Sequence, residues 1–146
     1  KKNISENVLI NGAMKVFTGL DWIDEDIHNP EKIVDFILKS AITNEACDLV
    51  DVVYVLFKCN QQTEYRKEDI EMYLKSLLPS IMSHYHSEYG GFSYFINKSQ
   101  THYYGIKITE GLNEPDLHGT ILLVWGLSMI FSTLEEFNIN WKVIKP

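Results

Sequence analysis

The sequence predicts an all-α domain of antiparallel helical hairpins, with one long aromatic-rich loop in its second half. Residues 66–84 repeat apolar side chains at helical spacing, the clearest such pattern in the chain. Asn29, Pro30 and Glu31 form a helix start signal: a capping residue, a proline at the first helical position and an acid near the positive helix end. Residues 121–131 are almost wholly apolar, which indicates a core helix.

Length and charge narrow the class of protein. The chain has 146 residues, enough for one domain with a buried core. Its 45% hydrophobic and 23% charged residues are usual for soluble globular proteins. The net charge is −7, and Lys and Arg never occur in runs longer than a pair, so we expect binding neither to nucleic acid nor to an anionic membrane surface. Residues 121–131 are too few to span a bilayer, so no membrane span is predicted.

The first residues and the cysteines indicate the context of the chain. It begins without Met, and Lys1 and Lys2 lead directly into a predicted helix. We therefore expect residues 1–146 to be a single helical domain taken from a longer protein. Cys47 and Cys59 fall on one predicted helix, about 18 Å apart at the usual helical rise, which is too far for a disulfide. Without a disulfide framework, we expect a reducing, cytoplasmic compartment.

The first three helices follow from apolar spacing and from turn residues. We expect them over residues 5–20, from residue 29 onward and over residues 45–60. The first has the apolar stripe Leu9, Ala13, Val16, Phe17 and Leu20, and the second has Ile33, Phe36, Ile37 and Ala41. Residues 49–57 hold many β-branched side chains, so a strand is the competing prediction there. Helix is favoured because two aspartates have i, i+3 spacing and no turn divides the run.

The fourth helix and the loop after it differ sharply in pattern. The helix is predicted over residues 66–84, and we expect Pro79 to kink or split it. Residues 86–115 contain six aromatic residues and four glycines without a clear period. This composition predicts a long loop, which allows a short hairpin around residues 92–96 and 103–108, and long loops in compact domains are often functional.

The last two elements are a helix and an extended segment. A fifth helix is predicted over residues 115–135, and its apolar residues on nearly all sides predict that its neighbours enclose it. Residues 139–144 are expected to form a strand or an extended segment on the surface. Inner and outer helices would then form two layers.

Asp116 and His118 are the strongest candidates for a functional role. Asp116 is placed to cap the fifth helix by accepting hydrogen bonds from its first amides, and a site residue facing a cavity is the alternative. His84 and His86 at i, i+2 would point to different sides of a helix, and no Cys or carboxylate follows at zinc-site spacing. We therefore predict no metal site and no cofactor.

The aromatic residues of the loop form the densest candidate binding group. The residues considered are Tyr89, Phe92, Tyr94, Tyr103 and Tyr104. They could line a pocket for a hydrophobic or sugar-like ligand. They could equally pin an irregular loop against the ends of helices, and packing is the favoured interpretation.

A family resemblance connects these parts. Residues 89–92, Tyr-Gly-Gly-Phe, are followed by the loop, by residues 114–120, Glu-Pro-Asp-Leu-His-Gly-Thr, and by an apolar helix. This order resembles a repeat of the terpenoid cyclase/protein prenyltransferase α/α-toroid superfamily. The resemblance implies part of a ring of helices around a cavity. At the place of the cyclase acid motif, Asp-x-Asp-Asp, the proton donor position holds His118, a weaker acid, and the Asp-x-Cys zinc element of the prenyltransferases is missing.

Three functions remain open at this point. The first is a catalytically degenerate toroid-like domain that uses the aromatic loop and the start of the fifth helix to bind a hydrophobic small molecule or the rest of a larger parent protein. The second is a cyclase- or prenyltransferase-like enzyme domain acting on a hydrophobic substrate, with Asp116 and His118 at the cavity mouth. The third is a structural or oligomerisation domain without any site.

Overall fold

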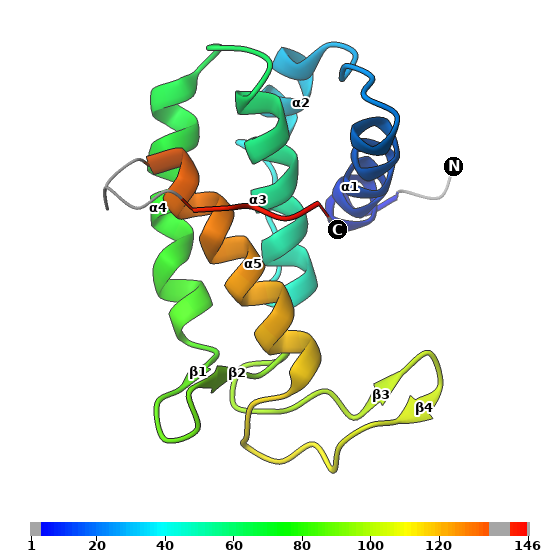
Figure 1. Ribbon diagram of the computed structural model, residues 1–146, viewed down its shortest axis with the longest axis vertical. Helices are drawn as coiled ribbons and strands as arrows, with labels where there is room; N and C mark the ends of the chain where they lie inside the picture. Colours follow the sequence, from blue (N-terminus) through cyan, green and yellow to red (C-terminus); the bar gives the residue numbers. More distant parts are fainter. Residues whose placement is uncertain (1–3, 135–140, 146) are drawn as a thin grey trace.

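The computed structural model describes residues 4–134 and 141–145, and the described part is mainly helical (Figure 1). Its helices are α1 (Glu6–Trp22), α2 (Pro30–Ile37), α3 (Ala46–Asn60), α4 (Lys67–Met82) and α5 (Leu117–Leu134). Two small antiparallel ladders lie between α4 and α5. They pair β1 (Tyr85–His86) with β2 (Gly91–Phe92) and β3 (His102–Tyr103) with β4 (Ile106–Lys107).

Helix α3 forms the centre of the bundle. It contacts α1, α2, α4 and α5, and every residue from 49 to 57 is buried. A helix that is surrounded in this way needs no polar face, which is why its sequence lacks the usual amphipathic pattern. The helix prediction for this run is confirmed over the competing strand.

The predicted apolar stripe of α1 is only partly right. Phe17 is buried, but Leu9 and Val16 are exposed and Ile10 is buried in their place. The face of α1 that meets α3 is partly polar, because two asparagine amides on it donate hydrogen bonds to aspartates of α3. The pairs are Asn7 with Asp48 and Asn11 with Asp51, both at 2.6 Å. Apolar spacing alone therefore misplaced the contact face.

Helices α2 and α4 also differ from the predictions at their ends. Helix α2 stops at Ile37, so Ala41 lies outside it and is exposed, and Phe36 is exposed as well. Helix α4 continues through Pro79 to Met82 as one helix, so of the predicted kink or split, the split is wrong. Pro79 lies in the last turn, where the N–H that it lacks costs a single helical hydrogen bond.

Helix α5 packs against α3, α4 and β2, and its Trp125 and Phe131 also contact residues 141–145. Its buried residues are Gly119, Leu123, Gly126, Met129, Ile130 and Thr133. Leu117, Ile121 and Val124 are exposed, which corrects the prediction that α5 is enclosed on nearly all sides. By length and composition α5 could cross a membrane, but a single core helix passes the same test.

The loop and the tail complete the architecture. The ladders do not join residues 92–96 to residues 103–108; β3 and β4 form a hairpin of their own, whereas β2 pairs with β1. Residues 141–145, which we call the tail, are extended and cross α5 toward α1, as predicted (Figure 1). The rest of the predicted C-terminal segment, residues 139–140, lies outside the described residues.

Candidate functional site

Close backbone packing at two glycines brings the loop onto the start of α5. A Cβ atom at Gly119 would lie 2.4 Å from the Tyr94 nitrogen and 2.5 Å from the Ser93 carbonyl carbon. At Gly91, a Cβ atom would lie 3.0 Å from Pro115 Cβ. Since any larger side chain at position 119 would push these segments apart, Gly119 is required by the fold of the loop, and Gly91 fits closely against Pro115.

Asp116 is the central anchor of this junction. Its Oδ1 accepts a hydrogen bond from the Gly119 N–H at 2.7 Å, which confirms the predicted helix cap. Its Oδ2 accepts the N–H groups of Tyr94 at 2.8 Å and Gln100 at 3.0 Å. The residue is only 6% exposed, so its carboxylate is committed to three backbone donors from two segments.

Thr120 and Phe92 form a second anchor beside the first. The Thr120 hydroxyl donates to the Phe92 carbonyl at 3.0 Å and accepts from the Phe92 N–H at 3.0 Å. The Asp116 N–H donates to the same carbonyl at 3.0 Å. The residue types that carry the family resemblance thus act together as a clamp between loop and helix.

His118 lies among aromatic rings rather than in bulk solvent. Its ring stacks on Tyr94 at 5.2 Å and meets Tyr103 edge-on at 4.8 Å. Its Nδ1 lies 2.7 Å from Gln100 Oε1, an acceptor, so Nδ1 carries the proton. Burial lowers the pKa of His118, and the negative charge of Asp116 opposes this shift. The ring is therefore a neutral packing partner at pH 7 rather than an acid.

The five predicted aromatic residues fall into separate environments. Phe92 and Tyr94 are buried, and Phe92 packs on Tyr85 with ring centres 5.1 Å apart. Tyr103, Tyr104 and Tyr89 are exposed. Tyr94 and Tyr103 meet at His118, whereas Tyr89 lies in the turn after β1.

Tyr89 lines a hollow at this end of the molecule. The hollow has a volume of about 310 Å³, and its walls are mainly polar. It is lined by Tyr85, His86, Ser87, Glu88, Tyr89 and Asn113. Such a lining suits a polar, sugar-like ligand better than a hydrophobic one.

The structural role of His84 was not recognised in the sequence. Its fully buried ring has Nδ1 2.9 Å from the Ser93 carbonyl and Nε2 2.8 Å from the Asn44 carbonyl, so it joins β2 to the connection before α3. His86 Nε2 lies 2.9 Å from the Ser93 hydroxyl. Across residues 4–134 and 141–145, no group of three or more His, Cys, Asp or Glu side chains is placed to hold a metal ion.

Neither cysteine has the environment of a reactive thiol. Burial raises the pKa of Cys47, and nearby acids, among them Asp51 and Asp48, raise it further against an opposing hydrogen bond with Tyr94. Burial raises the pKa of Cys59 to about 12. Thiols of this kind remain protonated at neutral pH and are poor nucleophiles.

Comparison of the chain with protein-family models, with curated proteins and with solved structures found no match. The similarity of residues 89–127 to a toroid repeat therefore rests on the residues themselves.

Proposed function

We propose that the chain is a toroid-like helical domain that binds a partner protein through the loop end and does not carry out the acid chemistry of the cyclases. The commitment of the Asp116 carboxylate to three backbone N–H groups carries this proposal. A carboxylate held in this way is an anchor for the fold. The neighbouring His118 is a weak acid packed between tyrosine rings.

The hairpin of β3 and β4 is the proposed binding element. It projects away from the helices (Figure 1) and exposes Tyr103, Tyr104, Ile106 and Ile108. Exposed tyrosines beside aliphatic residues are typical of energetically important positions in protein interfaces. Contact between the Tyr103 ring and His118 attaches the hairpin to α5.

The hairpin tip supports a role for its tyrosine. Tyr104 and Gly105 both have positive φ, 47° and 81°, as the two central residues of a type I′ turn do. Asn, Asp or Gly normally occupies the first of these positions, and a larger residue costs about 1 kcal/mol there. The Tyr104 ring meets the Tyr103 ring edge-on at 4.6 Å, yet the Tyr104 side chain stays 91% exposed, which favours an intermolecular contact.

Photo-crosslinking from the hairpin tests this proposal. A chain with p-benzoylphenylalanine at position 104 is compared with one carrying it at Met72, an exposed apolar position on α4. We expect position 104 alone to give one dominant adduct in cells. Excess unlabelled chain should suppress this adduct, and the Tyr104→Ser, Ile106→Ser chain should not. The same adducts from both positions, or equal competition by both chains, would reject the hairpin as the binding element.

A small polar ligand is the second candidate, because Tyr85, Tyr89 and Glu88 surround the polar hollow described above. The cyclase- or prenyltransferase-like alternative has less support, since its proton donor position holds His118 and the Asp116 carboxylate is occupied. The toroid assignment itself is part of the proposal and is supported by the clamp geometry.

A further inference from the structure

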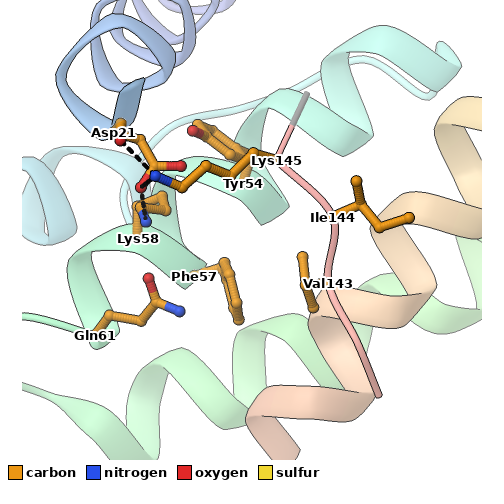
Figure 2. Close-up of a pocket in the computed structure, with 8 residues that line it drawn as sticks. All are labelled: Asp21, Tyr54, Phe57, Lys58, Gln61, Val143, Ile144 and Lys145. Carbon is orange, nitrogen blue, oxygen red and sulfur yellow. Dashed lines mark hydrogen bonds and ion pairs between the residues drawn. The ribbon is translucent and has the colours of Figure 1, made fainter. Parts of the chain in front are cut away.

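The tail lies across the bundle on three separate anchors. The Trp141 ring packs on Phe131, with ring centres 5.5 Å apart. The Trp125 Nε1–H donates to the Ile144 carbonyl at 3.0 Å. Lys145 then reaches the C-terminal end of α1 (Figure 2). The tail is thus an extended peptide bound along a helical surface.

Lys145 ends in an acidic environment. Its Nζ donates to the Asp21 carbonyl at 2.6 Å and lies 3.6 Å from the Asp21 carboxylate and 3.5 Å from that of Asp24. It also lies 6.0 Å from the centre of the Trp22 ring. Asp21 pairs with Lys58 as well, but Asp24 is 91% exposed. Residues 21–26, which we call the acidic turn, therefore attract a cation at this end of the tail.

The tail does not fill the space beneath it. A pocket of about 160 Å³ lies between the tail and α3 (Figure 2). We call it the tail pocket; its lining is Asp21, Tyr54, Phe57, Lys58, Gln61, Val143, Ile144 and Lys145. The pocket walls combine the Phe57 ring with the charged side chains of Asp21 and Lys58, and its empty volume can accept more than the tail supplies.

We propose that the tail pocket is a docking site for an extended peptide of a partner protein, with an aliphatic residue two positions before a lysine. The chain's own Val143 and Lys145 form part of its wall and act as a displaceable competitor. The pattern is read from the bound tail: Val143 lines the pocket and Lys145 meets the acidic turn. Charge complementarity supports such a partner, because Asp24, Glu25 and Asp26 are all exposed beside the lysine position.

The weakness of the anchors makes the tail displaceable. Exposed ion pairs such as Lys145 with Asp24 contribute little, and a single hydrogen bond holds the Ile144 backbone. The tail is retained mainly because it is tethered, which gives it a high effective concentration at the pocket. Breaking the Lys145 anchor should therefore open the pocket to a peptide added in solution.

A labelled peptide tests this directly. Fluorescein-Trp-Lys-Val-Ile-Lys, which copies residues 141–145, is titrated onto the full chain and onto its Lys145→Glu and Lys142→Glu variants. The control makes the same charge change at an exposed lysine of the same tail. We expect Lys145→Glu to bind the peptide about tenfold or more tightly than either of the others, because its own tail competes less. A peptide that ends in Glu should not bind.

Tryptophan emission provides an independent readout when the added peptide is unlabelled and carries Phe in place of its Trp. All three tryptophans of the chain, Trp22, Trp125 and Trp141, contact the tail or belong to it. Lys145→Glu should change their emission, and added peptide should reverse most of the Trp22 and Trp125 change. Equal peptide affinity in all three chains, or no binding to Lys145→Glu, would overturn the proposal. A concentration-dependent dimer of the unchanged chain, lost in Lys145→Glu, would also overturn it by identifying the tail of a second copy as the occupant.

Discussion

Two buried aspartates have opposite roles because their surroundings differ. Asp116 accepts three backbone N–H groups at the start of a helix. Asp51 lies in the middle of α3, where its carboxylate accepts a hydrogen bond from the Asn11 amide at 2.6 Å. Burial raises the pKa of Asp51, the bond from Asn11 lowers it, and the charge of Asp48 raises it again. Ionised Asp51 therefore opposes folding at neutral pH.

We predict that Asp51→Asn stabilises the fold at pH 7. The pKa of Asp51 is higher in the folded chain than its unfolded value of 3.8, so the folded chain binds more protons just above that pH. The contribution of Asp51 to the free energy of unfolding therefore falls as the pH rises from the unfolded pKa through the folded pKa. The Asp51→Asn variant has no carboxyl group there and does not lose this stability. We expect urea unfolding of the unchanged chain and of Asp51→Asn, from about pH 4 to pH 7, to give unfolding free energies whose difference grows as the pH rises. As a control, Glu88→Gln at an exposed position should leave the pH dependence of the unfolding free energy unchanged. An Asp51→Asn chain that is less stable than the unchanged chain at pH 7 would contradict the prediction.

At the scale of the elements, periodicity predicted which segments are helical but not which of their sides are buried. Helix α4 matched well because its single apolar stripe is its contact face. Helix α5 has apolar residues all round, so its pattern could not show that only one side meets α3 and α4. In α1, two of the residues that bond α3 are asparagines, which a stripe of apolar residues leaves out.

Adjacent residues on α5 test the assigned face. Leu123 is fully buried and Val124 is 50% exposed. Leu123→Ala should lower the unfolding free energy by about 2–5 kcal/mol, because it leaves a cavity against the core. Val124→Ala should change it by less than about 1 kcal/mol. Chemical denaturation of both variants measures the difference, and a reversed order would place the wrong side of α5 against the bundle.

For the whole molecule, the contacts that decide the site join segments far apart in the chain. The cap made by Asp116 to Gly119 was predictable, because both residues lie in one local sequence pattern. Its bonds to Tyr94 and Gln100 were not, since the path of an irregular loop has no period to read. The contact of Lys145 with Asp21 spans 124 positions, and no local signal predicts it.

The Asp116 carboxylate organises the fold of the loop by joining the loop to the start of α5. Amide hydrogen exchange in the unchanged chain, Asp116→Asn and Asp116→Ala tests it most directly. In Asp116→Ala we predict that the backbone amides of Tyr94, Gln100 and Gly119 lose about tenfold or more of their exchange protection, beyond the loss that all amides share. The Asp116→Asn chain should show an intermediate loss. The unfolding free energy should fall by on the order of 3 kcal/mol, because a cap and two further amides lose their acceptor. Unchanged protection at all three amides would contradict the claim and would leave the Asp116 carboxylate free for chemistry.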